Sequence, residues 1–93
     1  MENTLNPQII YDAFAERGFP VQRIDQFDRG DYAEVRVDLN YTNGLSVTQL
    51  QEITMKLGII EKHENVNLQV VNIDMGHQSM RVNIHIKEKP PNN

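Results

Sequence analysis

Two segments of the chain alternate between apolar and polar residues with a period of two. In residues 33–39 every second residue is apolar and those between are charged, and residues 80–86 follow the same rule with polar residues between. Such alternation is typical of β-strands with one face towards a core and one towards solvent. Segments 21–27 and 66–73 alternate less regularly, which is typical of edge strands. The chain therefore predicts four strands, arranged as two hairpins.

Helix boundaries are marked at two places. Asn6 is a suitable N-cap, and Pro7 suits the first helical position because no N–H is needed there. Ser46 begins a capping box for a second helix. Gly18 and Gly58 are predicted to end the two helices, since glycine readily adopts the left-handed conformation that follows a helix. One helix is thus expected before each hairpin.

The two halves of the chain repeat one another. The N-caps Asn6 and Ser46 are 40 positions apart, as are the two terminating glycines. The alternating strands repeat at a larger spacing of 47, which separates Val35 from Val82. We therefore predict a tandem duplication, with six or seven extra residues of the second copy in the polar segment 61–65.

These elements predict one α+β domain over residues 1–89 in the order αββαββ, with repeated units at about 5–41 and 45–88 and a solvated tail at 90–93. We expect a four-stranded antiparallel or mixed sheet with both helices on one face and the two alternating strands in the middle, parallel to each other. This arrangement is a ferredoxin-like sandwich whose first strand has moved to the end, a permuted form. The alternative is a dimer in which two chains exchange one αββ unit.

Composition narrows the classes of function. The 93 residues include thirteen acidic and nine basic ones, a net charge of −4, whereas nucleic-acid binding favours a basic surface. The outward positions of the central strands also lack the aromatic residues on which bases stack. The chain has no cysteine, no signal-peptide pattern at its N-terminus and no apolar run near the roughly 20 residues that span a bilayer. We therefore expect a cytoplasmic protein that binds neither nucleic acid nor membrane.

The sequence contains no recognisable catalytic motif. Its five glycines have none of the spacings of phosphate-binding loops, and its three histidines lack the spacing of metal ligands. None of its serines lies in a nucleophile elbow. We expect no catalytic residue, no metal and no cofactor, and we interpret the protein as non-catalytic.

The remaining candidate site is the outward face of the central strands. Arginine is enriched in binding hot spots, and Arg36 and Arg81 lie on this face. We predict an interaction or assembly module acting through this face or an edge strand, with another protein or a second copy as partner. The alternative is a regulatory domain that binds a small acidic ligand at this arginine pair, and an enzyme using His85 is the third hypothesis. The predicted interaction residues are Arg36, Asp38, Arg81, Asn83 and His85.

Overall fold

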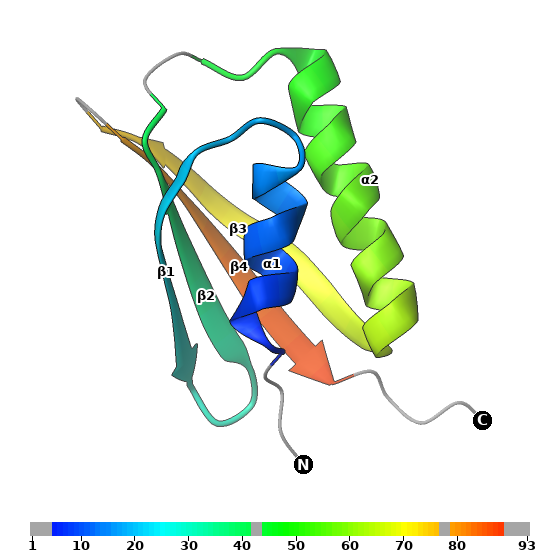
Figure 1. The fold of residues 1–93 in the computed structure, drawn as a ribbon. Helices are drawn as coiled ribbons and strands as arrows, with labels where there is room; N and C mark the ends of the chain where they lie inside the picture. Colours follow the sequence, from blue (N-terminus) through cyan, green and yellow to red (C-terminus); the bar gives the residue numbers. More distant parts are fainter. Residues whose placement is uncertain (1–4, 42–43, 77–78, 89–93) are drawn as a thin grey trace.

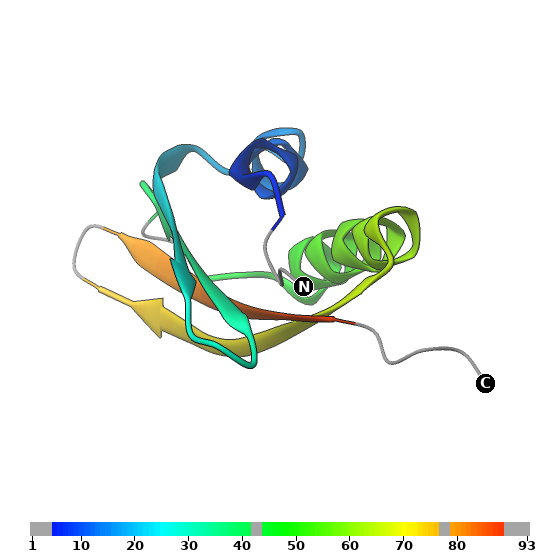
Figure 2. The ribbon, with the colours of Figure 1, turned by 90° about the horizontal axis from the view of Figure 1, so that it is seen from below.

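The computed structural model of the protein describes residues 5–41, 44–76 and 79–88, and two helices and four strands lie within these ranges. The elements are α1 (Pro7–Ala15), β1 (Val21–Asp28), β2 (Ala33–Leu39), α2 (Val47–Glu64), β3 (Val66–Met75) and β4 (Met80–Glu88). The strands form one sheet in the order β1-β2-β4-β3, and both helices cover the same face of it (Figures 1 and 2). The α+β class and the four-stranded sheet are confirmed, and the arrangement is consistent with a ferredoxin-like type of fold. The predicted tail at 90–93 and His77 lie outside the described residues.

The direction of the central strands corrects one prediction. β2 and β4 are neighbours in the middle of the sheet, as expected, but they are antiparallel rather than parallel. The cause is visible in Figure 1, where α2 returns the chain along the sheet before β3 begins. β3 therefore runs in the same direction as β2, and the following hairpin reverses β4. All neighbouring strands in the sheet are antiparallel.

A single apolar layer fills the space between the sheet and the helices. The alternating apolar residues of β2 and β4 are fully buried, which confirms the period-two prediction for both strands. α1 adds Ile10, Ala13 and Phe14, while α2 adds a stripe at helical spacing. Burial of an apolar side chain contributes roughly 1.5–3 kcal/mol, so this layer is the main source of stability. The core residues of α2 are Ile53, Leu57 and Ile60.

The end of α1 agrees with the sequence prediction. Gly18 has a φ of 82°, in the left-handed region. Its N–H donates to the carbonyl of Ala15 at 3.0 Å, and the N–H of Phe19 donates to the carbonyl of Phe14 at 3.1 Å. These two bonds are those of a Schellman motif, which satisfies the last carbonyls of a helix. The motif also turns Phe19 back into the core, where it is buried.

The end of α2 differs from the prediction. Gly58 lies inside the helix, which continues through Glu64 and ends at Asn65, whose φ of 54° is left-handed. The extra residues of the second unit therefore extend the helix instead of forming a connector. Segment 61–64 contains glutamate and lysine, which favour helices, and asparagine can replace glycine as a left-handed cap. No heavy atom lies within 4 Å of a Cβ built on Gly58, so no contact within the described chain requires a glycine there.

The start of α2 supports a first prediction. Ser46 Oγ accepts from the N–H of Gln49 at 3.0 Å, and Gln49 Oε1 accepts from the N–H of Ser46 at 2.9 Å. Ser46→Ala removes the first of these bonds, and we expect it to lower the free energy of unfolding by about 1 kcal/mol in urea denaturation. Thr48→Ala is the matched control, because Thr48 is exposed in the first turn. It is expected to stay within about 0.5 kcal/mol of the parent, and equal losses in both variants would contradict the capping role.

Candidate functional site

The face of the sheet opposite the helices carries the predicted interaction residues. We call it the open face. All five predicted residues lie on it, because their neighbours in β2 and β4 point into the core. The pairing of the strands places residues of both edge strands on the open face as well. The residues of the open face are Arg23, Asp25 and Phe27 of β1, Glu34, Arg36 and Asp38 of β2, Asn67, Gln69, Asn72 and Asp74 of β3, and Arg81, Asn83, His85 and Lys87 of β4.

One ion-pair cluster on the open face surrounds Glu34. Arg36 Nε donates to Glu34 Oε2 at 2.9 Å, and Arg29 Nη2 lies 3.1 Å from Glu34 Oε1. The hydrogen bond from Arg36 lowers the pKa of Glu34. The guanidinium carbons of Arg29 and Arg36 also lie 4.9 Å and 4.8 Å from the centre of the Phe27 ring, within cation–π range. Phe27 and Glu34 therefore hold Arg29 and Arg36 against the sheet.

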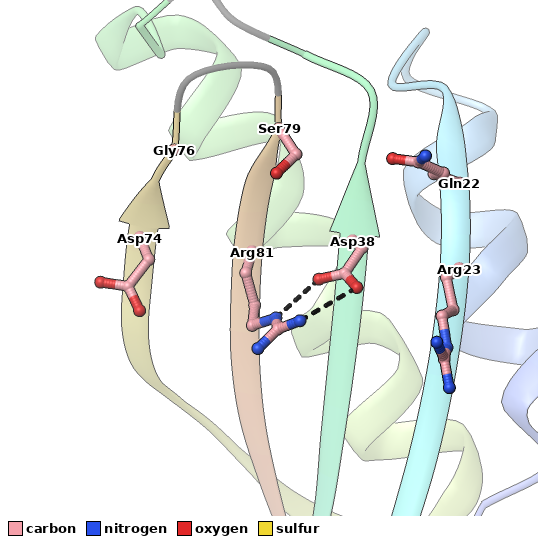
Figure 3. Close-up of a pocket in the computed structure, with 7 residues that line it drawn as sticks. All are labelled: Gln22, Arg23, Asp38, Asp74, Gly76, Ser79 and Arg81. Carbon is pink, nitrogen blue, oxygen red and sulfur yellow. Dashed lines mark hydrogen bonds and ion pairs between the residues drawn. The ribbon is translucent and has the colours of Figure 1, made fainter.

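A second ion pair lies at the other end of the open face (Figure 3). Arg81 Nε donates to Asp38 Oδ1 at 2.7 Å and Arg81 Nη2 to Asp38 Oδ2 at 3.3 Å. This hydrogen bonding raises the pKa of Arg81. The pair borders a shallow hollow of about 550 Å³, in which the formal charges of two arginines and two aspartates cancel. The hollow is lined by Gln22, Arg23, Asp38, Asp74, Gly76, Ser79 and Arg81.

The two arginines of the hypothesised anion site do not converge. Arg36 is bound to Glu34, and Arg81 is bound to Asp38. A small acidic ligand would therefore meet two guanidinium groups whose charges are already balanced by carboxylates of the chain. Only Arg81 of the two lines the hollow.

Two aromatic residues on or beside the open face were missed by the sequence argument. Phe27 comes from the irregular edge strand β1 and lies opposite Glu34. Tyr32 precedes β2, and its ring stacks on that of His85 with a centroid distance of 4.3 Å and an angle of 25°. The sequence argument considered the central strands alone. For Phe27 the available signal was its place in the hairpin, because residues opposite each other share a face.

Asn83 lies at the centre of the open face. It is paired with Arg36 on β2 and with Asn72 on β3. Its Oδ1 is buried, and no donor within the described part of the chain reaches it. His85, two residues along β4, has its ring covered by Tyr32. The centre of this face is therefore largely occupied by contacts of the chain with itself.

The two edge strands, β1 and β3, differ in how well they are protected against pairing with another strand. The irregular alternation of both segments did not predict this difference. β1 is preceded by Pro20 and carries charged residues along its length. Its Gln26 side chain also accepts from the N–H of Leu5 at 3.3 Å and donates to the carbonyl of Leu5 at 2.9 Å. Prolines and charges are features by which natural proteins protect edge strands. The β1 edge is thus protected by its own chain.

The other edge is less protected, although Glu61 Oε2 of α2 accepts a hydrogen bond from the N–H of Leu68 at 2.8 Å. We call β3, Val66–Met75, the β3 edge, and its ten residues include a single charge, Asp74. Val70, Val71 and Met75 are 40%, 48% and 47% exposed. The pairing with β4 shifts by one residue between Val70 and Asn72, so Val71 forms a bulge. The β3 edge is therefore a long strand with exposed apolar side chains and few charges.

Two searches for other kinds of site concern the described residues only. Within residues 5–41, 44–76 and 79–88, no three histidine, aspartate or glutamate side chains are grouped as metal ligands would be. No described helix is long and apolar enough to cross a membrane.

Comparison with known proteins does not assign the chain to a family. The chain matches no protein-family model, and no curated protein is significantly similar to it in sequence.

Proposed function

We propose that the protein is a non-catalytic interaction module that binds another protein chain along the β3 edge. The observation that carries this proposal is the exposure of Val70, Val71 and Met75 on an edge strand with one charged residue. An edge strand has backbone donors and acceptors on one side that no neighbouring strand uses. A second strand added there gains backbone hydrogen bonds, and its side chains give specificity.

The open face has a supporting role in this proposal. Its cations Arg36 and Arg81 are neutralised by carboxylates of the same face, and exposed pairs of this kind contribute about 0–1 kcal/mol each. Such a charged surface favours the solubility of a small domain. It would also supply polar residues around the contact between a partner chain and the β3 edge. Asn72 and Asp74 of the β3 edge lie on this same face. A partner on the β3 edge would therefore reach the open face near Arg81 first.

We also infer that the two αββ units arose by duplication and that the sheet is a permuted ferredoxin-like sandwich. The register of β2 with β4 supports this inference. Arg36 lies opposite Asn83, with Val35 opposite Ile84 and Val37 opposite Val82. Arg36 and Asn83 are 47 positions apart, the same spacing at which the strands repeat. A twofold axis through this pair would therefore exchange the two units.

The proposal is tested by placing a charge on the β3 edge. Val71→Lys replaces an exposed apolar side chain in the middle of this edge with a charged one, a change that opposes strand pairing, so we expect about tenfold weaker binding or more. The protein and its variant serve as bait in an extract of its own source, and captured chains, its own copies included, are quantified by mass spectrometry. At least one chain is expected to be captured by the parent and lost with Val71→Lys.

The matched control is Gln22→Lys. Gln22 is exposed and lies where the pairing of β1 with β2 shifts, so it is the bulge residue of the other edge strand. This variant adds the same charge to the protected edge, and we expect it to capture the same chains as the parent. Capture that is equal with Val71→Lys and Gln22→Lys would contradict a role for the β3 edge.

A further inference from the structure

The sequence of β3 is chemically symmetric about the bond between Val70 and Val71. Reading outwards from this bond, every apolar residue is matched by an apolar one and every polar residue by a polar one. The matched pairs are Val70 with Val71, Gln69 with Asn72, Leu68 with Ile73, Asn67 with Asp74, and Val66 with Met75. A strand with this symmetry suits pairing with an identical strand that runs in the opposite direction.

The bulge makes such pairing geometrically consistent. Before the bulge, the even-numbered residues Leu68 and Val70 lie opposite the core residues of β4. After it, the odd-numbered residues Ile73 and Met75 do so. In a regular strand, a twofold axis between two residues would place inward side chains opposite outward ones. The extra residue of the bulge shifts the alternation by one position. Side chains that point towards the helices therefore lie opposite side chains that also point towards the helices, on both sides of the axis.

We propose that the β3 edge binds the β3 edge of a second copy of this chain, antiparallel, about a twofold axis at Val70 and Val71. This inference rests on the proposed function and names its partner. The two sheets join into one continuous sheet with all four helices on the same face. On the helix side Leu68 then lies opposite Ile73, and on the open face Gln69 lies opposite Asn72.

The charges of the strand are compatible with this pairing. Asp74 lies opposite Asn67 of the second copy, so no carboxylate faces another. The two Asp74 side chains are seven residues apart along the paired strands, about 23 Å. Like charges directly opposite each other destabilise a sheet, and this register avoids them.

α2 adds a contact beside the paired strands. A hollow of about 420 Å³ lies between α2 and the start of β3, lined by Met55, Gly58, Ile59, Glu61, Lys62 and Asn67. In the proposed register Asp74 and Met75 of the second copy lie beside Asn67 and Val66. Met75 lies on the helix side of the sheet, so it approaches the apolar residues of the hollow, whereas Asp74 lies on the open face. The apolar surface of the hollow favours this occupant.

The proposed contact explains why position 58 of α2 is a glycine. A glycine inside a helix is less stable than alanine by roughly 0.5–1 kcal/mol, and no contact within the described chain requires it. Its missing side chain leaves room in the hollow at the place where the second copy approaches. A stable interface generally buries about 1,200–2,000 Å², and strand pairing together with this helix contact provides a larger area than the strands alone.

The oligomeric state is the first test. Sedimentation equilibrium over a concentration series is expected to show a reversible monomer–dimer equilibrium for the parent and for Gln22→Lys. Val71→Lys is expected to weaken the dimer by about tenfold or more. A parent protein that stays monomeric, or a dimer that Val71→Lys leaves unchanged, would overturn the inference.

The register is tested by disulfide cross-linking, because the chain contains no cysteine of its own. Gln69 and Asn72 are both exposed, so Gln69→Cys and Asn72→Cys are expected to fold normally. Mixed and oxidised, the two variants should form a cross-linked heterodimer, since residues opposite each other have Cβ atoms close enough for a disulfide. Either variant alone should cross-link poorly. Asn67→Cys mixed with Asn72→Cys is the out-of-register control, and cross-linking there at an equal yield would refute the register.

The two proposals fail in different ways. If the parent is monomeric but another chain is captured and lost with Val71→Lys, the second copy is the wrong partner and the interaction module stands. If Val71→Lys changes neither capture nor self-association, both proposals are wrong.

Discussion

Phe14→Ala is expected to lower the free energy of unfolding by about 3–5 kcal/mol. Phe14 is 1% exposed, and its ring meets the edge of Phe19 with a centroid distance of 6.4 Å. Truncation removes the burial of a large side chain and leaves a cavity between α1 and the sheet. A domain of this size has a total stability of about 5–15 kcal/mol, so much of it would be lost. Urea denaturation followed by circular dichroism measures the change.

Phe27→Ala is the matched control for this prediction. Phe27 lies on the open face and contacts Arg29 and Arg36 through cation–π geometry, with each contact contributing about 0.5–1 kcal/mol at an exposed site. We therefore expect a loss of about 1–2 kcal/mol, well below that of Phe14→Ala. Equal losses would mean that the apolar layer under the helices is not the main source of stability.

Gly18→Ala is expected to lower the free energy of unfolding by about 1–2 kcal/mol, because a Cβ is unfavourable in the left-handed region. The φ of 82° at Gly18 completes the Schellman motif that returns Phe19 to the core. No heavy atom lies within 4 Å of the added Cβ, so the cost comes from the backbone and not from a clash. Chemical denaturation of the variant measures it directly.

Gly58→Ala is the matched control, and we expect a change of opposite sign. Gly58 lies inside α2, without a positive φ and with open space around it. Alanine there should raise the free energy of unfolding of the monomer by about 0.5–1 kcal/mol, measured at a protein concentration below that of association. A loss with Gly58→Ala, or no loss with Gly18→Ala, would contradict the assigned helix ends.

The central strands show what a period-two pattern can and cannot predict. The alternation in β2 and β4 correctly predicted both strands and their buried face, since each buried residue is two positions from the next. It could not predict strand direction, which depends on how α2 carries the chain back along the sheet. Gly18 and Gly58 show a similar limit. The same residue ends α1 and lies inside α2, because the polar segment after Gly58 is itself able to continue the helix.

The surfaces were predictable to different degrees. The positions of Arg36, Arg81 and His85 on the open face followed from the alternation alone, but their partners did not. Ion pairing with Glu34 and Asp38 and the stacking of Tyr32 on His85 depend on side-chain geometry across strands. Irregular alternation in β3 was interpreted as an edge strand. Its cause is the bulge at Val71, which moves the inward face from even to odd positions.

Pro20 and the charges of β1 would limit how far the proposed assembly could grow. Cross-β fibres form when each chain offers two usable edges, so that every added strand creates a new site for the next. In this sheet the β1 edge is protected by Pro20 and its own charges. The twofold pairing proposed for β3 would use the other edge and leave no strand edge from which the assembly could grow. A chain with one edge available for pairing would form a closed dimer, and removal of the charges of β1 would allow further strands to be added to it.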